Sequence, residues 1–199
     1  GARVDVFGIP LVINKSTGKK FGKSEGGAVW LDSAKTSVYQ FYQFWLNVDD
    51  LSVVDYLKVY TFLSREEISE LEAQQQSHPE VRLAQHRLAE EVTKLVHGDA
   101  ALAKVQRVTE VLFGGRVVSE LDSDELDLLS AEIKTVELTS ELTVGRALLT
   151  GGVASSNGEA RRLIQGGGVS VNGVKLVTDQ PLDRCSLIRK GKNQFVLVR

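Results

Sequence analysis

Hydrophobic positions recur at helical spacing through the middle of the chain. From about residue 36, apolar residues return every three to four positions, which predicts a helix over the aromatic stretch and a second helix over 51–62. We interpret the aromatic face as core rather than as a platform on which bases stack. Its members are Tyr39, Tyr42, Phe44, Trp45 and Leu46.

Polar signals divide the following region into further helices. Ser-Arg-Glu-Glu at 64–67 and Ser-His-Pro-Glu at 77–80 have the order of capping boxes, so each predicts a helix start. The second would open a long helix that Gly98 ends, with Asp99 capping the next helix, 100–112, up to Gly114 and Gly115. The apolar stripe of the long helix would be Val81, Ala84, Leu88, Val92 and Leu95.

Another capping box, Asp122 with Glu125, predicts a short helix over 122–129. Together these signals predict an all-helical domain over 35–130. Before it, residues 4–13 are rich in β-forming residues that Gly8 and Pro10 interrupt. Residues 14–27 hold four lysines and four glycines without apolar periodicity, which predicts a mobile loop.

The end of the chain predicts a small α+β domain over 142–199, after an irregular linker at 131–141. Short helices are expected at 144–149 and 157–165, the second opened by Ser156 with Glu159 and ended by three glycines at 166–168. Asn172-Gly173 predicts a two-residue hairpin, and residues 190–193 predict another turn.

Composition narrows the class of protein. The 199 residues are 42% hydrophobic, and no apolar run reaches the ~18–20 residues of a membrane helix, so we expect a soluble, cytoplasmic chain with no membrane partner. The single Cys185 cannot form an internal disulfide and is expected to be a passive thiol. The sequence contains no Met, from which we expect a fragment of a longer protein.

Charge is unevenly distributed. Residues 139–199 hold nine Lys and Arg against four acids, a net charge of +5, whereas residues 1–138 hold 15 against 22, a net charge of −7. A basic terminal domain on an acidic body favours a polyanion as partner, although a solvated charged surface is equally compatible with charge alone.

Two lysines of the loop are spaced to bind phosphate. Lys20 and Lys23, three residues apart beside Ser24, can converge on one polyphosphate, and Gly22 eases closure of the loop. A nucleotide P-loop is excluded because Thr17 stands where that motif needs glycine, and because glycines rather than a helix follow Ser24. An isolated motif of this kind is more often a solvated basic loop.

The motif and the residues around it resemble a known protein family. Lys-Phe-Gly-Lys-Ser at 20–24 resembles the KMSKS signature of class I aminoacyl-tRNA synthetases in its tyrosyl form. The same family is resembled at 25–32, 35–37, 41–45, 56–58, 61–63 and 88–98, so the likeness covers essentially the whole chain. It implies a multi-domain α+β fold in which residues 1–34 end a Rossmann-type catalytic domain, residues 35–130 form an anticodon-binding domain and residues 142–199 bind RNA.

The resemblance also implies the activity, which is tyrosine activation by ATP followed by transfer to tRNA-Tyr. Lys20, Lys23 and Ser24 would be catalytic, and Phe21 and Gly22 would join them in binding ATP, with Mg²⁺ in the full enzyme and no tightly bound cofactor in the fragment. The family's HIGH motif is missing, since none of His78, His86 and His97 forms it. We therefore expect this piece to be inactive and monomeric alone, and homodimeric when full-length.

Residues 156–173 resemble the RNA-binding domain of ribosomal protein S-four. The residues expected to contact RNA phosphates are Arg146, Arg161, Arg162, Lys175, Arg189, Lys190 and Lys192. For Arg184 and Arg199 the sequence does not decide between RNA contact and a structural ion pair. Asp49 and Asp50 could contact anticodon bases, but capping of the helix near Leu51 is the more ordinary role for both.

Two other classes of protein are possible. A non-catalytic RNA-binding protein with an S-four-type domain would need no lysine signature at 20–24. A pseudouridine synthase would need a catalytic Asp in a β-rich domain, whereas 35–130 has a helical pattern.

Overall fold

The computed structural model describes residues 7–8, 11–22 and 29–199. The chain forms two compact units, residues 1–102 and 103–199, which we describe separately. The boundary lies inside the 35–130 segment that was expected to be one helical domain. Within the described residues, no helix has the length and apolar character needed to cross a membrane.

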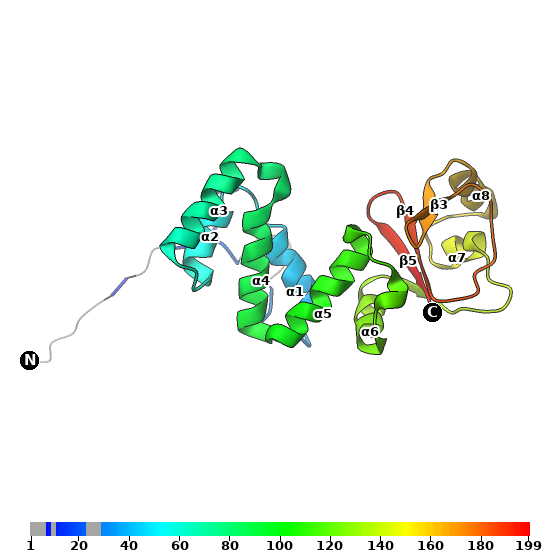
Figure 1. Cartoon of the computed structure of the whole chain (residues 1–199), viewed down its shortest axis with the longest axis horizontal. Helices are drawn as coiled ribbons and strands as arrows, with labels where there is room; N and C mark the ends of the chain where they lie inside the picture. The colour runs from blue at the N-terminus through cyan, green and yellow to red at the C-terminus, as the bar shows by residue number, and fades with distance from the viewer. Residues whose placement is uncertain (1–6, 9–10, 23–28) are drawn as a thin grey trace, which may run out of the picture. The chain divides into compact units, whose positions relative to one another are not determined.

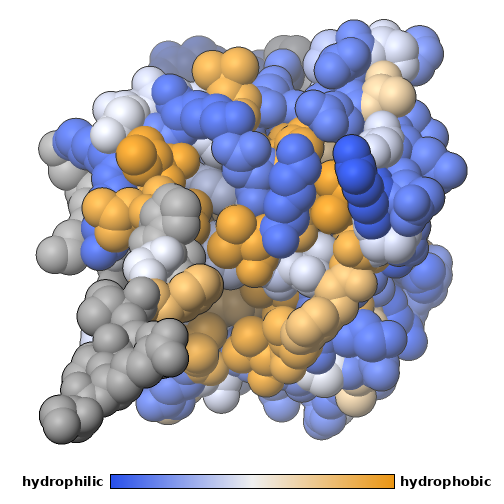
Figure 2. All heavy atoms as spheres, turned by 90° about the vertical axis from the view of Figure 1, so that its left-hand side faces the viewer, coloured by the Kyte–Doolittle hydropathy of each residue, from blue (hydrophilic) through white to orange (hydrophobic). Residues whose placement is uncertain are grey.

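The first unit is a helical bundle (Figure 1). It contains α1 (Val38–Leu46), α2 (Val53–Tyr60), α3 (Arg65–Ser77) and α4 (Leu83–His97), and α4 contacts each of the other three. The buried side chains include Phe41, Tyr42, Trp45, Val53, Tyr56, Leu57, Ala84, Leu88, Ala89 and Val92. On the face seen in Figure 2, apolar side chains gather in a band between polar ones.

The aromatic face of α1 differs from its prediction. Phe41, Tyr42 and Trp45 are buried, whereas Tyr39 and Phe44 are only half-buried. The interpretation of the aromatic stretch as core is confirmed for the three buried rings. The buried face of α1 differs from the predicted one because α1 packs against α4 through positions 41, 42 and 45, which fall on one side of a helix.

One of the two capping boxes in this unit is confirmed. Ser64 Oγ accepts a hydrogen bond from Glu67 N at 3.2 Å, and the Glu67 carboxylate accepts one from Ser64 N at 2.8 Å. The box predicted at 77–80 is wrong, because α3 continues through Ser77 and a 3-10 turn, Pro79–Val81, follows. The chain then turns at Arg82, which has a φ of 54°, and α4 begins at Leu83.

The buried stripe of α4 is confirmed only in its middle. Ala84, Leu88 and Val92 are buried, but Val81 precedes the helix and Leu95 is exposed. Gly98 ends the helix with a φ of 85°, as predicted. The next helix, α5 (Asp99–Thr109), includes Asp99 as its first residue and continues into a π-helical turn, Glu110–Gly114.

The second unit combines helices with a five-stranded sheet. Besides the end of α5 from residue 103 and the π-helical turn, it contains α6 (Ser123–Glu132), α7 (Val144–Thr150) and α8 (Asn157–Gln165), with a 3-10 turn at Val118–Glu120. The strands are β1 (Lys134–Val136), β2 (Val169–Val171), β3 (Val174–Leu176), β4 (Ser186–Lys190) and β5 (Gln194–Val198), in the order β1-β5-β4-β2-β3. Only β1 is parallel to its neighbour. The protein is therefore a mixed α+β chain.

The segment expected to be an irregular linker contributes to this sheet. Residues 134–136 pair with β5 from Val196 to Val198, so the expectation of an irregular crossing at 131–141 is wrong at these positions. The capping box of Asp122 and Glu125 is confirmed, with both reciprocal hydrogen bonds at 2.9 Å.

The hairpin and the two short helices form as predicted. Asn172 and Gly173 adopt φ angles of 48° and 83°, as a tight turn between β2 and β3 requires. Ser156 caps α8, but the Glu159 carboxylate bonds to Ser155 N and Oγ instead of to Ser156 N, so only half of that box exists. Helices α7 and α8 pack on one face of the sheet through a core that includes Val144, Ala147, Leu148, Ala160, Ile164, Val169, Val171, Ile188, Val196 and Val198.

Candidate functional site

The lysine-rich segment forms a closed turn as far as residue 22. Ile13 and Lys20 make an antiparallel bridge, and Phe21 N donates to Val12 O at 2.9 Å. Inside the turn, Asn14 N donates to Lys19 O at 2.9 Å. The first half of the expected mobile loop is thus hydrogen-bonded, and the exposed Lys20 stands where the turn closes.

Phe21 fixes this turn to the helical bundle. Its ring lies in a cluster with centroid distances of 4.5 Å to Tyr56, 5.5 Å to Trp45, 5.6 Å to Tyr60 and 5.8 Å to Phe44. Such aromatic pairs add stability beyond the burial of their area. The position that resembles the second residue of the signature therefore anchors the segment to α1 and α2.

The remaining signature residues lie at and beyond the end of the described turn. Gly22 has a φ of 84°, in the left-handed region where a side chain would be strained. Lys23 and Ser24 lie outside the described residues. Their expected roles in ATP binding and catalysis stay predictions.

A hollow of about 640 Å³ lies beside the turn. Lys19, Lys20 and Gly22 line it from the turn, and Asp49 and Tyr56 are among the residues that line it from the bundle. The Tyr56 hydroxyl is buried near the side chains of Ser52 and Asn14. Burial raises the pKa of Tyr56, so the group is a neutral phenol at physiological pH.

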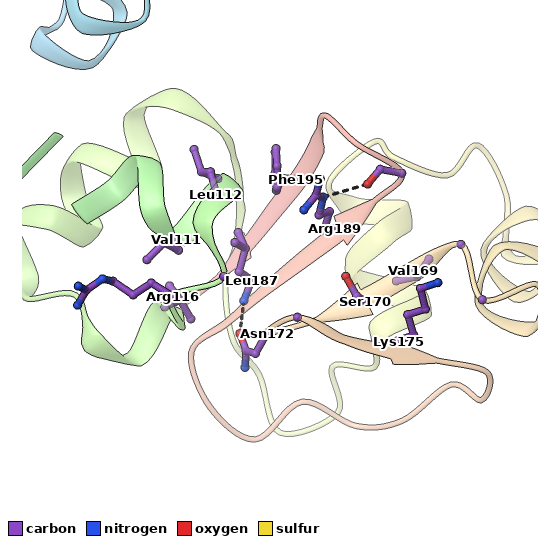
Figure 3. Close-up of a pocket in the computed structure, with 16 residues that line it drawn as sticks. Val111, Leu112, Arg116, Val169, Ser170, Asn172, Lys175, Leu187, Arg189 and Phe195 are labelled. Carbon is purple, nitrogen blue, oxygen red and sulfur yellow. Dashed lines mark hydrogen bonds between the residues drawn. The ribbon is translucent and has the colours of Figure 1, made fainter. Parts of the chain in front are cut away.

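The basic residues of the second unit lie on two faces of the sheet. Strand register places Lys175 opposite Ser170, Ser170 opposite Arg189 and Arg189 opposite Phe195, so these four side chains share the face away from α7 and α8. They line a groove of about 420 Å³ together with Arg116, which follows the π-helical turn (Figure 3).

The Arg189 side chain bonds to the turn that follows β4. Its Nε donates to Gly191 O and its Nη2 to Lys192 O, both at 3.0 Å, and its guanidinium lies 5.5 Å from the Phe195 ring centroid. Figure 3 shows this side chain directed at the turn. Lys192 is exposed at the tip, where its side chain is accessible to a ligand.

The helical side of the unit carries three other arginines. Arg161 and Arg162 are exposed on α8, and Arg161 lines a hollow of about 410 Å³ with Arg146 and Asp179. Arg146 lies 4.0 Å from Glu141, a distant and exposed ion pair. These arginines form a basic surface distinct from the groove on the opposite face of the sheet.

Lys190 has an internal role. Its Nζ donates to Val153 O at 2.9 Å and lies 3.6 Å from Glu159, so it ties β4 to the region of α7 and α8. Of the arginines left open, Arg199 bonds to Asp127 at 2.6 Å, and Arg184 lies 3.8 Å from Asp183. The basic residues therefore divide between the two faces of the sheet, and the RNA contacts of individual residues stay predictions.

Sequence patterns missed several contacts around the lysine turn. Asn14 bonds to Asp49, and Lys15 pairs with Asp55 at 2.6 Å, across 35 and 40 positions. The Asn-Lys-Ser-Thr sequence at 14–17 was a usable local signal, because an Asn side chain often bonds to backbone just ahead of it in a turn, as Asn14 does to Thr17 N. The described residues contain no group of three His, Cys, Asp or Glu side chains suited to a metal ion.

Comparison with known proteins places the chain in a family. Residues 3–114 match the family described as tRNA synthetases class I (W and Y), and residues 125–198 match the tyrosine--tRNA ligase SYY-like C-terminal domain. The first match covers more than half of the chain. The protein belongs to the class I tRNA synthetase family of the tryptophan and tyrosine type.

Curated relatives carry the name tyrosine--tRNA ligase. The chain is 43% identical over 205 residues to that of Macrococcus caseolyticus, covering 98% of this chain and 48% of the relative. It is 44% identical over 210 residues to that of Latilactobacillus sakei (100% and 50%), and 46% identical over 209 residues to tyrosine--tRNA ligase 1 of Vibrio parahaemolyticus (98% and 48%). The chain thus spans about half the length of the curated relatives it matches.

Proposed function

We propose that this chain is the C-terminal part of a tyrosine--tRNA ligase, which forms tyrosyl-adenylate from tyrosine and ATP and transfers the tyrosyl group to tRNA-Tyr. One observation carries the proposal: the Lys-Phe-Gly-Lys-Ser segment lies within the matched family region, and its Phe21 is packed into the helical bundle so that Lys20 is presented at a closed turn. A non-catalytic RNA-binding protein is not favoured, because that region, 3–114, matches the synthetase family.

The chemistry proposed for the turn is electrostatic. As pyrophosphate leaves, negative charge grows on the β- and γ-phosphates, and ammonium groups directed at them stabilise the transition state more than bound ATP. Lys20 and Lys23 would supply this charge, and the Ser24 hydroxyl would donate a hydrogen bond. Mg²⁺ would arrive with ATP as part of the substrate.

We further propose a division of labour among the segments. Residues 1–34 would complete a Rossmann-type catalytic domain, residues 35–130 would approach the anticodon stem-loop, and residues 142–199 would bind RNA through phosphate contacts. The sequence match over 125–198 and the exposed arginines of α8 support the last assignment. A cytoplasmic homodimer of the longer protein, with a monomeric and inactive isolated chain, completes the proposal.

Pyrophosphate exchange in a full-length polypeptide that contains these residues tests the proposal. Lys20→Ala should lower the rate about 10²- to 10³-fold with little change in KM for tyrosine, the range typical of a lost electrostatic donor. Lys58→Ala is a matched control, because Lys58 is exposed on α2 and lines a hollow with Leu63 and Ile68, not with residues of the turn. Unchanged exchange after neutralising both Lys20 and Lys23, or exchange by the isolated 199 residues, would contradict it.

A further inference from the structure

We infer that Asn14 and Asp49 are positioning residues that hold Lys20 in place for adenylate formation. The inference rests on the proposed function, since it assigns these two residues a role in the same reaction. The hydrogen bond between them joins the lysine turn to the segment between α1 and α2, across 35 positions of sequence.

Asn14 is the residue on which the turn closes. Its Oδ1 accepts from Thr17 N at 2.8 Å and from Thr17 Oγ1 at 3.0 Å, and its backbone carbonyl accepts from Gly18 N at 2.8 Å. Its amide Nδ2 is left to donate outward, and it donates to Asp49 Oδ2 at 2.9 Å. The orientation of the Asn14 side chain is therefore determined by contacts on both of its polar atoms.

Asp49 is held just as firmly on the other side. Its Oδ1 accepts from Ser52 N at 3.0 Å, so Oδ2 is directed at Asn14. Burial raises the pKa of Asp49, but hydrogen bonds from Ser16 and Ser52 lower it more, so the carboxylate stays ionised at neutral pH. Asp49, a candidate in the sequence for contact with an anticodon base, thus uses both carboxylate oxygens for hydrogen bonds within its own unit.

Further contacts run parallel to this hydrogen bond. Lys15 N donates to the fully buried Ser52 Oγ at 2.9 Å, and Lys15 Nζ pairs with Asp55 at 2.6 Å. At the closing end of the turn, Phe21 packs on Tyr56 of α2. The turn is attached at both ends to the start of α2, and Lys20 lies between these attachments.

This geometry matters for rate because electrostatic stabilisation depends on placement. A displacement of about 1 Å at a reacting group can cost about 10²-fold in rate. Loss of the Asn14–Asp49 bond would loosen one attachment of the turn and shift Lys20 without removing an ammonium group. It should therefore lower kcat for adenylate formation and leave KM for tyrosine unchanged.

The two side chains can be exchanged without losing the bond. In Asn14→Asp two carboxylates face each other, and in Asp49→Asn two amide donors face each other, because Ser52 N fixes the remaining oxygen. In the double exchange, an amide at position 49 again donates to a carboxylate at position 14, which can still accept from Thr17. Asp50→Asn is the matched control, since Asp50 contacts Gln85 rather than the turn.

The experiment measures pyrophosphate exchange by the full-length polypeptide carrying each variant, with and without Lys20→Ala. Each single exchange should lower kcat about 10- to 100-fold, the double exchange should recover to within about threefold, and Asp50→Asn should change little. In the Lys20→Ala background each single exchange should lower kcat further by less than about twofold, because the ammonium group that Asn14 and Asp49 position is already absent.

Retained kcat in the single exchanges, an equal loss in the Lys20→Ala background, or no recovery in a folded double exchange would each overturn the inference. Should a single exchange fail to fold, Ser52→Ala tests the same attachment, with kcat again expected to fall only when Lys20 is present. The proposed function would instead be contradicted by wild-type protein that lacks exchange activity, or by a Lys20→Ala substitution that leaves the exchange rate unchanged. The two failures are therefore distinguishable.

Discussion

The ring of Phe21 lies with its centroid 4.5 Å from that of Tyr56, a fully buried residue of α2. Phe21 is itself half-buried and follows directly on Lys20. The contact joins the end of the lysine turn to the core of the helical bundle. The same side chain that marks the tyrosyl form of the signature thus contributes to the stability of the first unit.

Phe21→Ala should destabilise the first unit by about 2 kcal/mol, less than the ~3–5 kcal/mol typical of a fully buried Phe. The change removes apolar area and leaves part of the aromatic cluster exposed to water. Urea unfolding followed by tryptophan fluorescence measures it, because Trp30 and Trp45 both lie in this unit.

Phe62→Ala is the control for this change, since Phe62 is 89% exposed and should contribute less than about 0.5 kcal/mol. Equal effects of the two substitutions would show that Phe21 is not anchored in solution.

Glu125→Ala should destabilise the second unit by about 3 kcal/mol. Only 2% of the Glu125 side chain is exposed; its Oε2 accepts from Asp122 N at 2.9 Å, and its Oε1 lies 3.1 Å from Arg107 Nε. Loss of the capping hydrogen bond costs about 1 kcal/mol. Arg107 is 41% exposed, so losing its partner costs less than the ~3–5 kcal/mol typical of a fully buried ion pair. Because the tryptophans and tyrosines all precede residue 103, amide hydrogen exchange of α6 and β5 is the suitable measurement.

A control lies one residue earlier on the same helix. Asp124 pairs with Lys104 at 2.6 Å but is exposed, so Asp124→Ala should have a much smaller effect. Similar protection of the sheet in both variants would contradict the structural role of Glu125.

Local signals in the sequence were sufficient for several elements. The capping boxes at 64–67 and 122–125 and the Asn172-Gly173 hairpin depend on atoms three residues apart or fewer, so their side chains specify the structure without knowledge of the fold. The lysine signature was likewise recognisable as a short string.

Features that depend on distant partners could not be predicted. β1 is three residues long and becomes a strand only because β5, about sixty residues later, pairs with it. The Asn14–Asp49 bond spans 35 positions for the same reason. Pro79 was interpreted as the first turn of a helix, which is sterically possible, but the guanidinium of Arg82 bonds to Leu46 O and Val48 O where the chain turns into α4.

Acidification should destabilise the first unit through His97. Burial lowers the pKa of this imidazole from its ordinary 6.5, its Nε2 is buried without a partner in the described structure, and its ring lies 4.8 Å from that of Phe41. The unfolded chain therefore binds the proton more readily than the folded one. The stabilisation is complete above pH 6.5 and is lost as the pH falls toward the lowered pKa.

His97→Gln should accordingly remove this part of the pH dependence of urea unfolding between pH 7.5 and about 5.5. His86→Gln on the same helix is the control, because His86 is exposed and should leave the wild-type dependence in place. An unchanged pH profile in His97→Gln would show that another group titrates.

Lys190→Ala should reduce the stability of the second unit by about 1–2 kcal/mol, because it removes the ammonium bonded to Val153 O and leaves Glu159 with fewer contacts. Lys192→Ala, two residues later and exposed, should leave stability unchanged. Hydrogen exchange of β4 measures the difference. If the two variants were equally stable and Lys190→Ala alone weakened RNA binding, the internal role would be wrong.

Arg161→Ala with Arg162→Ala should weaken binding of tRNA-Tyr by the 199-residue chain and make it less sensitive to salt. Each phosphate contact releases counterions, so loss of two should reduce the slope of log affinity against log salt by about 1.5–2. Both arginines are exposed on α8, so the fold should be unaffected.

Since phosphate contacts carry no sequence information, an unrelated tRNA should lose affinity by the same factor. Arg199→Ala is the control, because its guanidinium is already bound to Asp127. Binding that is insensitive to salt, or a loss confined to tRNA-Tyr, would exclude phosphate contacts as the role of this helix.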